Sequence, residues 1–179
     1  MPVHSKFARP APLLLAFLAF SWGSAAAQVV VRGVPFSSFG AIDAADYDAD
    51  GDDDLFVTGG VLSPDLMSGH ATLLQSDGTG FVDSGANLSG VFSGDVSCGD
   101  LEGDGDLDLL VAGIEKLEIP DNRQIVVYEQ IDSGFVLRHR FRGVLFGPTI
   151  WFDYNGDGRL DILTAGIQEG SLVMILFEL

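Results

Sequence analysis

The chain has 179 residues and a mass of 19.0 kDa, which is enough for one domain or two very small ones. Lys and Arg number 9 against 26 Asp and Glu, a formal net charge of −17. A surface that binds nucleic acid must be basic to displace the counterions of the phosphates, so this charge argues against DNA, RNA and anionic membrane surfaces as partners. Hydrophobic residues make up 47%, which excludes a disordered polar tract, and the single cysteine excludes an intrachain disulfide framework and a cysteine-based zinc site.

Residues 1–27 have the three-part pattern of a secretory signal peptide. Lys6 and Arg9 come first, an apolar run of ten residues ends at Phe20, and small residues end the segment at Ala27. The apolar run is too short for a helix to cross about 30 Å of hydrocarbon. We therefore expect cleavage after Ala27 and no membrane span in residues 28–179, which form a secreted or periplasmic protein.

The rest of the chain repeats itself three times. Three segments align without gaps, with starts 54 and 53 residues apart: Asp46–Leu55, Asp100–Leu109 and Asp153–Ile162. Each is followed by a short apolar run that ends in glycine, and then by runs of alternating polarity between turns rich in Gly, Asp and Ser, which predicts strands and no helices. Each unit of about 53 residues holds about four strands, the size of one β-propeller blade. The predicted fold is all-β, with about three four-stranded β-propeller-type blades.

Acidic or amide side chains recur at positions 1, 3, 5 and 9 of each segment, counted from its first aspartate, with glycine at position 6. The alternate spacing lets side chains 1, 3 and 5 converge, while the glycine permits a sharp turn that directs the backbone carbonyl of position 7 inward. Such a set of hard oxygen ligands suits Ca²⁺, which takes 6–8 oxygens at about 2.3–2.6 Å, better than Mg²⁺ or zinc. We expect up to three calcium ions, in loops 46–54, 100–108 and 153–161. The predicted metal-binding residues are Asp46, Asp48, Asp50, Asp52, Asp54, Asp100, Glu102, Asp104, Asp106, Asp108, Asp153, Asn155, Asp157, Arg159 and Asp161.

Two other interpretations of these loops fit less well. Ordinary surface turns need one or two Asp or Gly residues, not four oxygen-bearing side chains in register three times over. An EF-hand loop closes with an acid at position 12, whereas position 12 here is Val57, Val111 or Thr164. Loop three should bind calcium most weakly, because Asn155 removes a negative charge and Arg159 adds a positive one.

These features together resemble the FG-GAP/VCBS repeats of integrin α-subunit propellers and of many secreted bacterial proteins. The Phe-Gly pair is present as Phe39-Gly40 and Phe146-Gly147, the middle repeat has Phe92-Ser93, and Leu73–Phe81 resembles the bacterial version. The resemblance covers nearly all of residues 28–179. It implies calcium-binding propeller blades in an extracytoplasmic setting. It implies no single activity, because such repeats occur in adhesins, in polysaccharide-degrading enzymes and in modules of unknown role.

We expect a module that acts by binding or adhesion to a protein or glycan. His70 and His139 have no recognisable nucleophile motif nearby, so the sequence gives no catalytic residues. The alternatives are a scaffold or fragment of an extracellular carbohydrate-active enzyme, or a structural piece of a larger secreted protein. Arg138, Arg140 and Arg142 share one face of a predicted strand, either as a solvated surface or as a contact for an acidic partner.

The two ends of the chain match complementary parts of the repeat. Ser171–Leu179 is an apolar strand that ends where the second unit continues into a further strand, and Gln28–Val31 falls where such a strand begins. Three blades do not close a ring, because propellers have at least about four. We therefore expect Ser171–Leu179 to pair with Gln28–Arg32 of a second copy, giving a homodimer. The alternative is a fragment of a longer propeller.

Overall fold

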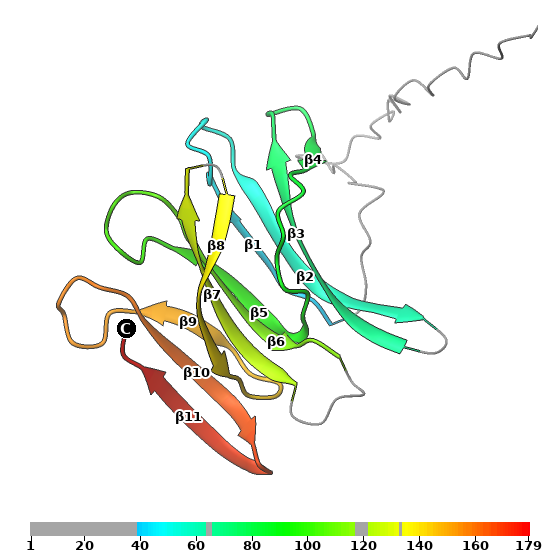
Figure 1. Cartoon of the computed structure of the whole chain (residues 1–179), viewed down its shortest axis with the longest axis vertical. Coiled ribbons are helices and arrows are strands. Elements are labelled where there is room, and N and C mark those ends of the chain that lie inside the picture. The colour runs from blue at the N-terminus through cyan, green and yellow to red at the C-terminus, as the bar shows by residue number, and fades with distance from the viewer. Residues whose placement is uncertain (1–38, 64–65, 117–121, 133) are drawn as a thin grey trace, which may run out of the picture. The chain divides into compact units, whose positions relative to one another are not determined.

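The computed structural model describes residues 39–63, 66–116, 122–132 and 134–179 (Figure 1). These residues form eleven β-strands and no helix, so the all-β class is confirmed. No stretch of the described chain is a helix long and apolar enough to cross a membrane. The expected signal peptide, residues 1–27, and the expected pairing strand Gln28–Arg32 lie outside the described residues.

The strands form three antiparallel sheets in chain order, and every strand pairs with its neighbour in sequence. The first two sheets have four strands each, and the third has three among the described residues. The first sheet contains β1 (Ile42–Ala45), β2 (Asp54–Ser63), β3 (Leu66–Ser76) and β4 (Phe81–Asp83). The second contains β5 (Phe92–Gly99), β6 (Asp108–Ile114), β7 (Arg123–Ile131) and β8 (Gly134–Arg142). The third contains β9 (Thr149–Phe152), β10 (Asp161–Gln168) and β11 (Ser171–Phe177).

The burial of each strand follows its place in the sheets. The apolar runs after the acidic segments form strands, as predicted: they are β2, β6 and β10, the second strand of each sheet. β6 is buried along its whole length. The outer strand β8 alternates at its end, with His139 and Phe141 half-buried between exposed arginines. On β11, Leu172 and Met174 are 86% and 73% exposed, and no strand of the described chain pairs with its outer edge.

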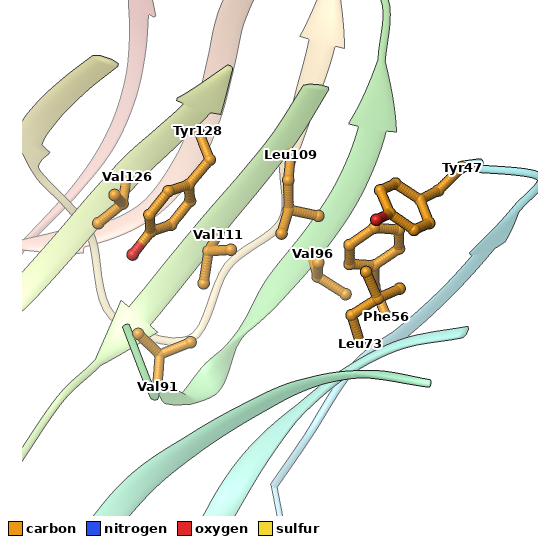
Figure 2. Packing of buried hydrophobic residues seen from close by; sticks show 9 residues of the cluster. All are labelled: Tyr47, Phe56, Leu73, Val91, Val96, Leu109, Val111, Val126 and Tyr128. Atoms are coloured by element: carbon orange, nitrogen blue, oxygen red, sulfur yellow. The ribbon is translucent and has the colours of Figure 1, made fainter. Parts of the chain in front are cut away.

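The core consists of two layers, one on each face of the second sheet. Because successive residues of a strand point to opposite faces, Leu109 and Leu110 of β6 belong to different layers. The first layer joins sheets one and two, and Figure 2 shows its members: Tyr47, Phe56, Leu73, Val91, Val96, Leu109, Val111, Val126 and Tyr128. The second layer joins sheets two and three through Leu101, Leu110, Ala112, Ile125, Val127 and Ile162.

A sharp corner lies just before β1 and β9 and at the start of β5, where the pairing with β6 shifts register. Its first residue has a left-handed backbone, with φ of +64° at Phe39, +52° at Ser93 and +55° at Phe146. The next residue is glycine (40, 94 and 147), where a Cβ would overlap the carbonyl oxygen of Thr58, Ala112 or Ala165. The middle corner is therefore Ser93-Gly94, and the pairing of Phe92-Ser93 with the two Phe-Gly pairs was wrong by one residue. The neighbouring backbone comes so close that the second position of each corner must be glycine. Phe39 and Phe146, at the first position, are exposed, so packing does not require phenylalanine there.

Candidate metal centre

The three acidic loops are the hairpin connections between the first and second strands of each sheet: β1–β2, β5–β6 and β9–β10. In all three, the aspartate at position 1 accepts the backbone N–H of the glycine at position 6. The N···O distances are 3.0 Å for Asp46 and Gly51, 3.0 Å for Asp100 and Gly105, and 3.1 Å for Asp153 and Gly158. This bond curls each loop around its first carboxylate.

The glycine at position 6 has the left-handed backbone that the sequence predicted, with φ of +99° at Gly51, +98° at Gly105 and +86° at Gly158. A second left-handed residue stands at position 4, which the sequence reasoning missed. It is glycine in loops two and three, but Ala49 in loop one, with φ of +58°. An alanine there strains the backbone by about 1 kcal/mol, because its Cβ crowds the following carbonyl oxygen.

Loop one brings three predicted ligands together. Carboxylate oxygens of Asp46, Asp48 and Asp50 all lie within 4.8 Å of one another. Two oxygens bound to one Ca²⁺ can be at most about 5 Å apart, twice the Ca–O distance, so this cluster fits around a single ion. The side chains of Asp48 and Asp50 are exposed, and three like charges at this spacing repel one another until a cation neutralises them.

Loop two holds its carboxylates differently. Glu102, at position 3, forms a hydrogen bond with the carboxyl group of Asp108, at position 9. Burial, followed by the nearby charge of Asp108, raises the pKa of Glu102 to about 7. Burial also raises the pKa of Asp108. Positions 3 and 9 therefore approach each other closely enough to share one cation or one proton.

Loop three replaces one carboxylate with an amide. Asn155 donates its side-chain N–H to Asp157 at 2.9 Å, and its oxygen accepts the backbone N–H of Asp157 at 2.9 Å. The backbone N–H of Arg159, and then the amide of Asn155, hold the pKa of Asp157 below its usual value. The loop is therefore largely satisfied by its own hydrogen bonds, and its oxygen set carries less charge than those of the other loops.

Position 7 contributes a backbone donor in each loop. The N–H groups of Asp52, Asp106 and Arg159 donate to the carboxylate at position 5, at 2.9, 3.0 and 2.9 Å respectively. The side chains of Asp106 and Arg159 are exposed, and that of Asp52 is half-buried. This donation turns the chain at position 5, in all three loops alike.

The aspartates at position 9 are buried and bridge backbone groups, a role that sequence reasoning missed. Asp54 accepts the N–H of Tyr47 at 3.2 Å and that of Ser76, at the end of β3, at 2.7 Å. The equivalent pairs are Leu101 and Gln130 for Asp108, at 2.7 and 3.0 Å, and Tyr154 and Leu179 for Asp161, at 3.1 and 3.0 Å. Asp54 and Asp108 therefore join their loops to the third strand of the same sheet, and Asp161 joins its loop to the chain just after the third strand, β11. A cation is not needed for that contact.

The arginine face of β8 is engaged within the chain. Arg138 pairs with Glu129 at 2.9 Å, Arg142 pairs with Glu169 at 3.0 Å, and Arg140 donates to the side-chain oxygen of Gln124. His139 stacks on Phe141, with ring centroids 5.8 Å apart. These contacts give the face a structural role in holding the second sheet together and joining it to the third.

Comparison with known proteins does not assign the chain to a family. No protein-family model matches the sequence, and no curated protein matches it either.

Proposed function

We propose that this protein is an exported, calcium-binding repeat module of the β-propeller type, related to FG-GAP/VCBS repeats, that acts by binding or adhesion. The observation that carries the proposal is the cluster of Asp46, Asp48 and Asp50, whose oxygens lie within 4.8 Å of one another. Hard oxygen ligands on a curled hairpin favour Ca²⁺ over Mg²⁺, which demands a tighter octahedron and keeps more of its water.

Contacts between the first strands of successive sheets support the propeller arrangement. Asp43 of β1 accepts the backbone N–H of Cys98 of β5 at 2.8 Å. Trp151 of β9 donates its indole N–H to the carbonyl of Ser97, also on β5, at 3.2 Å. The first strands thus contact one another in the order β1, β5, β9, as the inner strands of neighbouring blades do around a propeller axis.

The direction of these strands places the three loops together. The corners at residues 39–41, 93–95 and 146–148, which lie just before β1, at the start of β5 and just before β9, line one shared hollow, so the three strands start at a common end. The acidic loops that follow lie at the other end of the sheets (Figure 1). A surface with up to three calcium ions at one end suits a module that presents a ligand-binding face.

Thermal unfolding of the full chain with calcium and with EDTA tests the proposal. A cation that binds only the native state stabilises it by RT ln(1 + [L]/Kd), about 1.4 kcal/mol per site at a tenfold excess over Kd. For a chain of this size each such site should raise the Tm by about 3–6 °C. We expect Asp50→Asn to reduce the calcium effect, while Asp132→Asn, which removes an exposed acid from the β7–β8 turn, leaves it unchanged. Identical melting curves in calcium and EDTA contradict calcium binding.

A further inference from the structure

A cavity of about 510 Å³ opens beside loop one, where that loop, the end of β3, the connection from β4 to β5 and the start of β8 meet. Its volume lies in the range of about 300–1,000 Å³ that is usual for small-molecule sites. The side chains that matter to its chemistry are Tyr47, Gln75, Ser84, Asn87 and Phe135. The cavity adjoins the oxygen cluster through Tyr47, which lies between Asp46 and Asp48 in the chain, and through Gln75, which bonds to Asp48.

The polar groups of this cavity are uncharged. Among the described residues that line it, none is acidic, basic or histidine. The amides of Gln75 and Asn87 and the hydroxyl of Ser84 each offer both donors and acceptors. A neutral ligand with several hydroxyl groups matches that set, because each hydroxyl also donates and accepts. An anionic ligand would find no cation in the lining and a chain of net charge −17 around it.

One wall of the cavity is a fixed aromatic ring. Phe135 stacks on Tyr47 with ring centroids 5.5 Å apart and an interplanar angle of 28°, and it meets Phe56 edge-on at 5.7 Å. Figure 2 shows Tyr47 next to Phe56 at one end of the core layer. Because these contacts hold the ring of Phe135 in place, it loses little conformational entropy when a ligand binds, and it offers the ligand a flat apolar surface. The C–H face of a pyranose is a flat apolar surface of matching size.

We propose that this cavity binds a neutral, hydroxyl-rich ligand of the saccharide class, with the sugar ring against Phe135 and its hydroxyl groups on Gln75, Ser84 and Asn87. Gln75 donates one amide hydrogen to Asp48 at 3.1 Å, so its second hydrogen and its carbonyl oxygen remain for the ligand. Asp48 is also a member of the oxygen cluster, and a cation there fixes the position of Gln75. This link to calcium rests on the proposed function, whereas the cavity's own chemistry does not.

Saturation-transfer NMR and titration calorimetry on the full chain test the inference. The probes are methyl α-D-glucopyranoside, D-galactose and maltose, with glucuronate and glucosamine as charged counterparts. We expect at least one neutral sugar to bind, and Asn87→Ala or Gln75→Ala to weaken it by at least about tenfold, the equivalent of about 1.4 kcal/mol. Gln168→Ala, which removes an amide at the end of β10, should leave sugar binding unchanged.

Each of three results overturns the saccharide site. The first is that no neutral sugar binds to the folded, unmutated chain. The second is that Asn87→Ala binds the sugar as tightly as the unmutated chain, and the third is that the charged sugars bind more tightly than the neutral ones. Calcium stabilisation is measured in the same samples. Sugar binding without any calcium effect supports the cavity and contradicts the proposed calcium sites. Calcium stabilisation without sugar binding contradicts the cavity alone. Sugar affinity that is equal in calcium and EDTA overturns the link through Gln75.

Discussion

Loops one and three have the same backbone frame and different oxygen sets. In both, the aspartate at position 1 accepts the backbone N–H of the glycine at position 6, at 3.0 and 3.1 Å. A buried aspartate at position 9 joins the loop to the end of the third strand or to the chain just after it. Loop one then gathers three carboxylates, whereas loop three has Asn155 bonded to Asp157. The two loops therefore share positions 1, 6 and 9, which build the hairpin, and differ in charge at position 3, Asp48 against Asn155, and at position 7, Asp52 against Arg159. These differences should set the affinity of each loop for a cation.

The substitution with the largest predicted effect on stability removes the buried aspartate at position 9 of loop one. Asp54→Ala removes the acceptor of two backbone N–H groups, in a site where the side chain is fully buried. We expect a loss of about 2–4 kcal/mol in the free energy of unfolding, because both donors lose their partner. Urea unfolding in EDTA measures it, with Asp53→Ala, an exposed neighbour, as the control. A loss that occurs only in calcium contradicts a structural role for position 9.

Exchanging the residues at position 3 of loops one and three tests whether ligand charge sets their calcium affinity. Asn155→Asp gives loop three the carboxylate of loop one, and Asp48→Asn gives loop one the amide of loop three. We expect calcium affinity to rise about tenfold at the first and to fall about tenfold at the second, since ligand charge tunes such sites. Titration calorimetry measures both. Unfolding in EDTA should change little for either variant, and changes of the opposite sign in affinity contradict the charge argument.

A smaller effect concerns position 4, where loop one has alanine and the other loops have glycine. Ala49→Gly should stabilise the protein by about 1 kcal/mol, because the left-handed backbone then no longer crowds a Cβ. Gly156→Ala should destabilise it by a similar amount. Gly80→Ala is the control, since that position has open space and an ordinary φ, and alanine there should be neutral or slightly stabilising. Equal effects of Gly156→Ala and Gly80→Ala on the free energy of unfolding contradict strain at position 4.

Much of this frame could be predicted from the sequence, because its signals are local. The apolar runs of β2, β6 and β10, the turn at the glycine of position 6 and the exposed arginines of β8 follow from spacing within a few residues. The corners at the starts of β1, β5 and β9 were harder to predict. Aligning them on phenylalanine put Phe92 in place of Ser93, although the glycine is what the packing requires.

The rest depends on contacts between residues far apart in the chain. The bond from Asp54 to Ser76 spans 22 residues and the bond from Asp161 to Leu179 spans 18, so the role of position 9 follows only from the pairing of the strands. The short strands β1 and β9 mix apolar and polar residues and give no periodic signal of their own. The cavity beside loop one depends on how four separate segments meet, and no local pattern marks it.

The central claim is that loop one binds calcium through its clustered carboxylates. A crystal of the full chain grown in calcium chloride, with anomalous scattering used to locate the ions, tests it most directly. We predict an ion bound by Asp46, Asp48 and Asp50 with Ca–O distances of about 2.3–2.6 Å, and higher occupancy there than in loop three. An ordered loop one without an anomalous peak, in a crystal with millimolar free calcium, would contradict the account.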